Sequence, residues 1–172
     1  MKKVLIIVAS DSDLPVVADA AKILEDFGVE YEITLSSAHR SPDRSVALVE
    51  KAHKGGVKVI IAAAGLAAHL AGVVAAHFPL PVIGIPLKGG ALHGIDALYA
   101  TVQMPPGIPV ATVGVDNSKN AGLLAVQVLA TSDKRLEKKL IEYKKELAVG
   151  VEKKAAKLGK LGLQEYIEEL KK

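Results

Sequence analysis

The sequence has no cysteine and no tryptophan, and only 2 phenylalanines and 4 tyrosines among its 172 residues. The absence of cysteine excludes disulfide bonds, thiolate nucleophiles and zinc sites built on cysteine. The scarcity of aromatic rings argues against binding of single-stranded nucleic acid, because proteins of that class stack bases on aromatic side chains. The apolar residues that are present are mostly aliphatic, which is typical of buried parallel strands covered by helices.

The net charge is small, at a formal +3. The segment 133–172 holds 12 basic and 8 acidic side chains, so its balance of +4 leaves −1 for the rest of the chain. In this segment the basic residues alternate with glutamate, which favours a solvated helix face over a nucleic-acid surface. We therefore expect no nucleic-acid partner.

Long uninterrupted hydrophobic runs are also lacking. The most apolar stretch, 57–86, contains His69, His77, glycines and prolines, so it predicts a strand, a helix and a second strand rather than a membrane span. The apolar run after Lys2 and Lys3 is shorter than the core of a secretory signal and lacks a cleavage site. We expect a cytoplasmic protein with no membrane partner.

Short apolar runs alternate with helical patterns along most of the chain. The predicted strands are 4–8, 31–35, 57–63, 81–85 and 110–115, and the predicted helices are 14–27, 42–53, 67–76, 94–102 and 117–129. Asp13 and Ser41 are expected to cap the first two helices, each with a proline in the first turn. This alternation implies βαβ units with right-handed crossovers. The predicted fold class is α/β, a flavodoxin-like three-layer sandwich with a five-stranded parallel sheet and the strand 57–63 at its centre.

The composition changes after Ala130. An apolar stripe at helical spacing lies among lysines and glutamates and consists of Leu136, Leu140, Tyr143, Leu147 and Val151. Gly159 and Gly162 are expected to break this helix before a short final helix, 163–170. We divide the chain into a flavodoxin-like catalytic domain, 1–130, and a helical tail, 131–172, that packs on the core or on a neighbouring subunit.

Polar side chains follow the first two predicted strands, in the segments 10–13 and 37–40. The carboxyl ends of strands are where open α/β sheets bind ligands. Ser10 and Ser12 precede a helix, where free N–H groups favour phosphate, whereas the neighbouring carboxylate suits ribose hydroxyls. In the second segment His39 offers an acid/base group, and the serine and arginine beside it suit phosphate. The alternatives are an ordinary loop histidine and a simple helix cap at Asp13.

Two further histidines follow later strands. His69 is either a second imidazole of the site or a satisfied buried histidine, and His93 lies in a glycine-rich loop. Together with His39 they could bind a metal, but the sequence has neither an HExxH motif nor a paired carboxylate, so we expect no metal. It also has no Walker A motif and no GxGxxG, so nucleotide cofactors are not expected.

Several segments in order resemble the class I N5-carboxyaminoimidazole ribonucleotide mutases of purine biosynthesis. The resemblance runs from about Lys3 to Leu129 and includes a similar helical tail. The matching segments are Ser10–Asp13, Ser37–Arg40 with Pro42–Arg44, Ala67–Leu70, Leu80–Gly84, Val102–Pro105, Pro109–Thr112 and Lys119–Ala121.

This resemblance implies a flavodoxin-like subunit in a homo-octamer with sites at subunit junctions, acting on a small nucleotide substrate without metal, ATP or biotin. The reaction moves a carboxylate from the exocyclic nitrogen to a ring carbon of aminoimidazole ribonucleotide. By the same resemblance His39 is the catalytic acid/base, with His69 as the second catalytic residue. The substrate-binding residues implied are Ser10, Ser12, Asp13, Ser37, Ala38, Arg40, Gly65 and Leu70, of which the last two line the base and carbon dioxide pocket with His69.

The chain also departs from the family pattern. The family usually has glycine at Ala9 and Leu66, proline at Ala71 and serine at Ala97 and Ala100, and its hydroxyl-bearing loop is here Gly89–His93. Glycine is used where backbone must approach a ligand. Two alternatives to a mutase are therefore a redesigned self-assembling octameric scaffold with little or no catalysis and a relative that binds another sugar phosphate. The alanine- and glycine-rich helix 67–76 packs either on its own sheet or at a subunit junction.

Overall fold

A computed structural model describes residues 2–171. The chain divides into two compact units, of which the first ends at Ser132 and the second begins at Asp133. The first unit contains all the predicted strands, and the second is helical. The packing of the tail on the core or on a neighbouring subunit stays a prediction.

The first unit is built on a parallel sheet of five strands in the order β2-β1-β3-β4-β5. The strands are β1 (Val4–Val8), β2 (Tyr31–Leu35), β3 (Val59–Gly65), β4 (Val82–Leu87) and β5 (Ala111–Thr112). Val8 pairs with Leu35 on one side and with Ala63 on the other, so the carboxyl ends of β1, β2 and β3 meet at one edge. β3 is central, as predicted.

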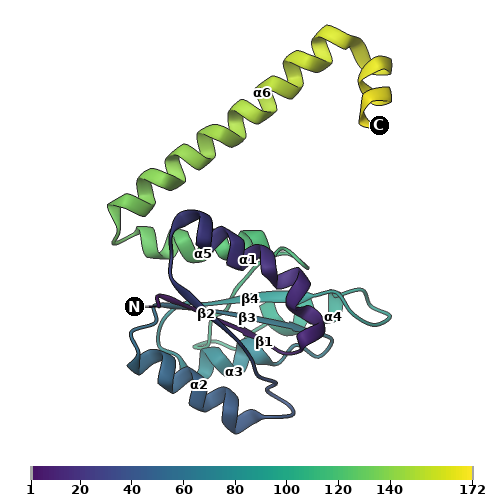
Figure 1. The fold of residues 1–172 in the computed structure, drawn as a ribbon. Helices are drawn as coiled ribbons and strands as arrows, with labels where there is room; N and C mark the ends of the chain where they lie inside the picture. The colour runs from purple at the N-terminus through teal and green to yellow at the C-terminus, as the bar shows by residue number, and fades with distance from the viewer. Residues whose placement is uncertain (1, 172) are drawn as a thin grey trace. The chain divides into compact units, whose positions relative to one another are not determined.

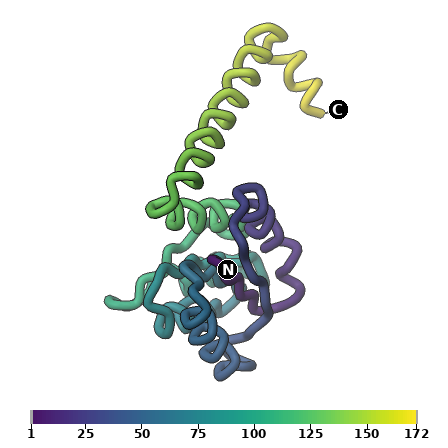
Figure 2. Tube along the Cα trace, turned by 60° about the vertical axis from the view of Figure 1, so that its left-hand side comes forward, coloured from purple at the N-terminus to yellow at the C-terminus, as the bar shows by residue number. Residues whose placement is uncertain are grey.

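Helices cover both faces of this sheet. α1 (Leu14–Phe27) and α5 (Ser118–Ala130) pack together on one face, and α2 (Pro42–Lys54) and α3 (Leu70–His77) pack together on the other (Figures 1 and 2). α4 (Ile95–Val102) packs on β4 and β5. Because both faces are covered, every residue of β1 and β4 is buried. The predicted flavodoxin-like three-layer sandwich is confirmed.

Some element boundaries were predicted wrongly. β3 lies two residues later than expected, and β5 pairs with β4 only through Ala111 and Thr112 instead of extending over 110–115. Beyond Thr112 the chain stays beside β4 without regular strand pairing: the N–H groups of Val113 and Asp116 bond to the carbonyls of Gly84 and Pro86, and a turn closes with the N–H of Asn117 on the carbonyl of Gly114. α3 begins at residue 70 rather than 67, because the residues before it form an irregular turn in which Leu66 has a φ of 54° and the N–H of Ala68 bonds to the carbonyl of Leu66 at 2.8 Å.

The two predicted helix caps are corrected by the structure. Asp13 and Ser41 occupy the N-cap positions of α1 and α2, but in the described chain neither side chain accepts a hydrogen bond from the helix it precedes. Asp13 has helical dihedral angles because it ends the short 3-10 turn η1 (Asp11–Asp13), so its backbone is not in the extended conformation typical of a cap. Both side chains are therefore available for other contacts.

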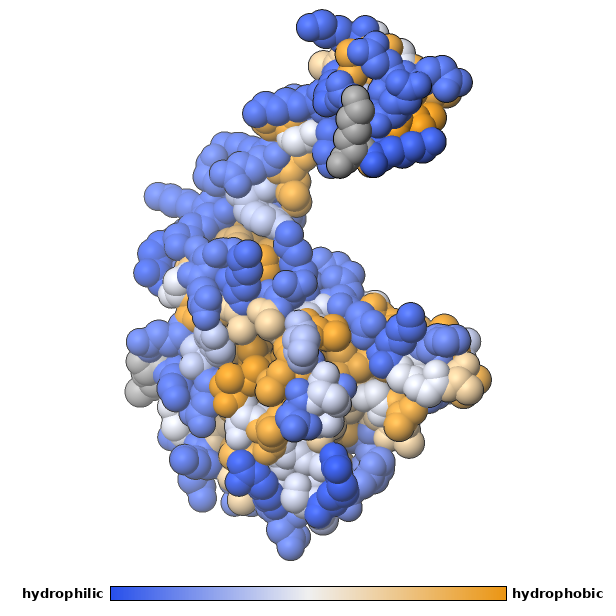
Figure 3. Space-filling model, turned by 45° about the vertical axis from the view of Figure 1, so that its right-hand side comes forward, coloured by the Kyte–Doolittle hydropathy of each residue, from blue (hydrophilic) through white to orange (hydrophobic). Residues whose placement is uncertain are grey.

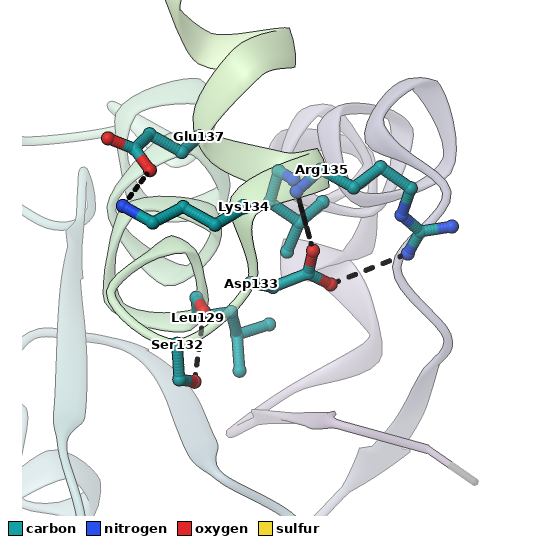
Figure 4. A network of polar contacts seen from close by, with 7 residues as sticks. Leu129, Ser132, Asp133, Lys134, Arg135 and Glu137 are labelled. Atoms are coloured by element: carbon teal, nitrogen blue, oxygen red, sulfur yellow. Dashed lines mark hydrogen bonds and ion pairs between the residues drawn. The ribbon is translucent and has the colours of Figure 1, made fainter.

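The second unit is the helix α6 (Lys134–Leu170). Asp133 caps it by accepting hydrogen bonds from the N–H groups of Arg135 and Leu136 at 2.9 and 3.3 Å, and Lys134 pairs with Glu137 at 2.7 Å (Figure 4). A cap of this kind stabilises a helix by about 1 kcal/mol.

The helix is interrupted once near its end. Gly162 has non-helical dihedral angles, φ 74° and ψ 170°, as predicted, and an ion pair between Lys157 and Glu169 joins the two sides of this kink. The predicted break at Gly159 is wrong, since that residue is helical; a glycine inside a helix costs only about 1 kcal/mol. Within residues 2–171, no helix has the length and apolar character needed to span a membrane.

Candidate active site

The turn after β1 gathers hydroxyl and carboxylate groups. The hydroxyls of Ser10 and Ser12 lie 2.9 Å apart, and the carboxylate of Asp11 accepts the N–H of Ser12 at 3.0 Å. These bonds fix the short turn η1 and direct its polar side chains to the edge of the sheet where β1 ends. The serines predicted to hold the phosphate and ribose thus lie together at the expected place.

Asp13 is the most perturbed carboxyl group of this turn. Partial burial raises its pKa, and the negative charges of Asp11 and Asp116 raise it further, while a hydrogen bond from Ser12 acts in the opposite direction. The carboxyl group accepts this bond at 3.5 Å and caps no helix. A carboxylate held in this way can accept hydrogen bonds from vicinal hydroxyls such as those of a ribose.

The turn after β2 presents the predicted acid/base group. His39 lies in a turn over 38–40, and its side chain is exposed. The N–H of Arg40 donates to the hydroxyl of Ser37 at 3.2 Å, which closes the turn. The guanidinium of Arg40 reaches back to the carbonyl of Ala9 at 3.3 Å, so the turns after β1 and β2 are joined. The structure therefore brings the two predicted segments together.

The two predicted catalytic histidines are in contact. The rings of His39 and His69 stack with centroids 5.5 Å apart and an angle of 5° between their planes. His69 occupies the N-cap position of α3, after β3, so β2 and β3, the two strands that flank β1, are each followed by one imidazole of the stack. Both side chains are exposed, which excludes the alternative of a buried histidine at 69.

The remaining predicted binding residues differ in what they can offer. Gly65 ends β3, and a Cβ there would lie 3.2 Å from the carbonyl oxygen of Leu87, so this backbone has little room for a side chain. Leu70 is only 1% exposed and belongs to the core, so its side chain is not open to a ligand. Ala38 is partly buried and packs against the same core.

Leu66 occupies a backbone conformation that favours glycine. Its φ is 54°, and its side chain is 55% exposed. Its Cδ2 lies 2.9 Å from the position that a Cβ on Gly90 would occupy and 3.5 Å from that on Gly89. The side chain of Leu66, in the turn after β3, therefore extends toward the glycine-rich loop after β4. By contrast, Ala97 is fully buried, so the serine usual there in the family would not face the open site.

Sequence reasoning missed Asp116. This residue has a φ of 56°, and its carboxylate accepts the N–H of Lys88 at 2.8 Å, which ties the loop after β4 to the turn after β5. Its charge also contributes to the raised pKa of Asp13. The available signal was an aspartate between the fifth predicted strand and the helix after it, the same placement that drew attention to Asp13.

The residues present do not form a metal centre. Across residues 2–171 there is no group of three histidine or carboxylate side chains arranged to hold an ion. His93 has a φ of 51° in the loop Gly89–Gly94 and is exposed. His69 also lines a mainly apolar groove of about 400 Å³ with Val73 and Met104. The site can thus offer acid/base and anion-binding groups beside an apolar surface.

Comparisons with known proteins show the family to which the chain belongs. The chain is 52% identical over 164 residues to the N5-carboxyaminoimidazole ribonucleotide mutase of Pyrococcus horikoshii, which covers 95% of this chain and 93% of the relative. It is 50% identical over 167 residues to the Thermotoga maritima protein of the same name, covering 97% and 98% of the two chains. The crystal structure of Treponema denticola PurE superimposes with a TM-score of 0.84 at 29% identity, over 90% of this chain and 97% of that one. The model of the AIR carboxylase family matches residues 3–149, and the chain belongs to this family.

Proposed function

We propose that this protein is an N5-carboxyaminoimidazole ribonucleotide mutase of purine biosynthesis. The observation that carries the proposal is the stack of His39 on His69 beside two hydroxyl-bearing turns, in a chain about half identical to proteins of that name. An assembly scaffold without catalysis, the alternative reading of the sequence, gains no support from these relatives.

The reaction is an isomerisation that needs one group to give and take back a proton. The bond between the exocyclic nitrogen and the carboxyl carbon breaks, carbon dioxide is released, and the nitrogen takes a proton from His39. The ring carbon then attacks the carbon dioxide and gives its proton to the same imidazole, which ends unchanged. Histidine suits both steps because its protonation changes near neutral pH.

The polar turns hold the rest of the substrate in this proposal. Ser10, Ser12 and Ser37 donate hydroxyl protons to the phosphate, and Arg40 contributes a positive charge. Asp13 accepts from the ribose hydroxyls. His69 keeps the imidazole plane of His39 fixed by stacking on it. The apolar groove beside His69 receives the uncharged carbon dioxide.

The experiment is an ultraviolet absorbance assay of the interconversion of the two carboxylated ribonucleotides by purified protein. His39→Asn is expected to lower kcat by about 100-fold or more, the usual contribution of a general acid/base. His53→Asn is the matched control, because His53 on α2 packs edge-on against Phe78, which follows α3, and takes no part in the proposed site. A wild-type protein that is folded but silent would refute the mutase. Full activity in His39→Asn would move the proton transfer to another group.

We also propose that the protein acts as a homo-octamer. Support comes from α4 and the turn before it, where large apolar side chains are exposed at helical spacing, namely Leu92, Ile95, Tyr99 and Val102. Exposed apolar patches of this kind mark interaction surfaces, and Figure 3 shows hydrophobic residues gathered on the face of this unit turned to the viewer. The family resemblance sets the number of copies.

Native mass spectrometry tests the assembly. Eight copies of an 18.0 kDa chain give a particle of about 144 kDa, with the closed symmetry usual for homo-oligomers. Tyr99→Lys is expected to break it down, because burial of an unpaired charge at an interface is costly. An 18.0 kDa species in the wild-type protein would refute the octamer.

A cytoplasmic location, expected for an enzyme acting on a phosphorylated nucleotide, is checked by cell fractionation.

A further inference from the structure

Four serines, joined through hydroxyl and backbone groups, lie next to the turn that presents His39. Ser36 and Ser45 are buried, and their hydroxyl oxygens lie 2.9 Å apart. The hydroxyl of Ser45 also lies 3.4 Å from the carbonyl oxygen of Ser41. The hydroxyl of Ser41 lies 3.1 Å from both the nitrogen and the carbonyl oxygen of Ser37. The four residues thus form a continuous network from the end of β2 to the first turns of α2.

Because each serine hydroxyl has only one proton, the donor and the acceptor of each hydrogen bond in this network can be assigned. Ser45 has one hydroxyl proton, and donating it to the carbonyl of Ser41 requires Ser36 to donate to the oxygen of Ser45. The backbone of Ser36 is fixed in turn, because its N–H donates to the carbonyl of Val8 at 3.0 Å. The buried pair is therefore satisfied at both ends and anchored to the central part of the sheet.

Ser41 holds the backbone on the side of the turn that leads into His39. Its hydroxyl accepts the N–H of Ser37 and donates to the carbonyl of the same residue, which also accepts the N–H of Ser41 at 2.8 Å. The hydroxyl of Ser37 accepts the N–H of Arg40, so it keeps its own proton for a ligand. This arrangement explains why Ser41 does not cap α2: its hydroxyl is used by the turn instead.

We propose that Ser41, backed by the buried pair of Ser36 and Ser45, is a positioning residue that keeps His39 against His69. The inference rests on the proposed mutase function. His39 is exposed, so the shape of the turn over 37–40 determines where its ring lies. A displacement of about 1 Å in a reacting group can cost about 100-fold in rate. Removal of the Ser41 hydroxyl frees the N–H of Ser37 and loosens the turn.

The test compares Ser41→Ala with Ser41→Thr, which keeps the hydroxyl. We expect Ser41→Ala to lower kcat by about tenfold or more, with a smaller change in KM because the turn after β1 still binds substrate, and Ser41→Thr to restore most of the rate. Ser132→Ala is the control for loss of a hydroxyl bonded to backbone, since Ser132 donates to the carbonyl of Leu129 at the end of the first unit (Figure 4). Equal kcat values in the alanine variant at 41 and the wild type would overturn the proposal.

A second readout does not depend on turnover. The imidazole resonances of His39, assigned by their loss in His39→Asn, are expected to shift or broaden in Ser41→Ala and to stay unchanged in Ser132→Ala. If the wild-type protein has no mutase activity, the proposed function is refuted, but the His39 resonances still test whether Ser41 positions this histidine. If Ser41→Ala does not fold, Ser36→Ala serves in its place. It removes only the buried hydroxyl that donates to Ser45, and we expect a smaller shift of the His39 resonances. Unchanged resonances in a folded variant would refute the role.

Discussion

Leu66 offers the sharpest test of how backbone conformation shapes the site. A leucine with φ near +54° lies in the left-handed region, which costs an L-residue roughly 1–2 kcal/mol. Replacement by glycine removes this strain but adds about 0.5–1 kcal/mol of conformational entropy to the unfolded state. Because the leucine side chain is 55% exposed, little buried apolar surface is lost. We therefore expect Leu66→Gly to be more stable than Leu66→Ala by about 0.5–1 kcal/mol.

The alanine variant separates the two effects of the leucine. Leu66→Ala keeps the strained backbone and removes the side chain beyond Cβ, whose Cδ2 lies on the side of Gly89 and Gly90, whereas Leu66→Gly removes the strain as well. A difference of 1 kcal/mol moves the midpoint of thermal unfolding by about 2–4 °C in a protein of this size. If the isobutyl group narrows the substrate pocket, both variants will show a lower KM in the mutase assay.

Thermal denaturation tests the strain at Leu66, and steady-state kinetics test the effect of its side chain on substrate binding. Equal melting temperatures for the glycine and alanine variants would refute the reasoning about strain. A KM that falls in the glycine variant alone would show that backbone approach, not bulk, limits binding. An unchanged KM in both variants would mean that the leucine points away from the substrate, toward the loop after β4.

Two further predictions concern charge and packing. Burial raises the pKa of Asp13, so its protonated form is favoured in the folded protein and stability falls as pH rises from 3.8 through the raised pKa. Asp13→Asn should therefore unfold at a higher temperature than the wild type at pH 7 and lose this advantage below pH 3.8, and a constant difference across pH would contradict this reasoning. Gly84→Ala places a Cβ 2.3 Å from Cγ2 of Thr101 and 3.0 Å from Cγ1 of Val110, so it should lower the free energy of unfolding by about 1–3 kcal/mol in urea titrations. A neutral result would mean that α4 moves freely on β4.

The alternation of strands and helices and the central position of β3 could be predicted because they depend on the hydrophobic pattern. The unbroken apolar run within Val59–Gly65 has to be buried on both faces, and that requires the centre of a parallel sheet. The ends of elements were harder to predict, because they depend on single dihedral angles. Leucine rarely adopts a positive φ, so the turn at Leu66 could not be predicted from its residue type. For the same reason the start of α3 at residue 70 was not predicted.

The chemistry of the site was readable where a side chain acts by its own functional group. His39 and His69 are the only imidazoles that follow β2 and β3 directly, and parallel strands bring such turns to one edge. The supporting contacts were not readable in the same way. Asp116 acts on the site through the N–H of Lys88, 28 residues earlier, and no local pattern encodes that contact.

Ser41 shows that one residue can fit the sequence pattern of a helix cap and yet support the functional site instead. Ser41 followed by Pro42 fits a helix start, and the helix does start there, yet the hydroxyl is bonded to Ser37 instead of the first turn. A hydroxyl that can satisfy either backbone will take the partner that tertiary structure brings closer. The turn over 37–40 is also tied to the end of β1, because the guanidinium of Arg40 donates to the carbonyl of Ala9. The helix loses one cap bond, and the turn that carries the acid/base group gains two.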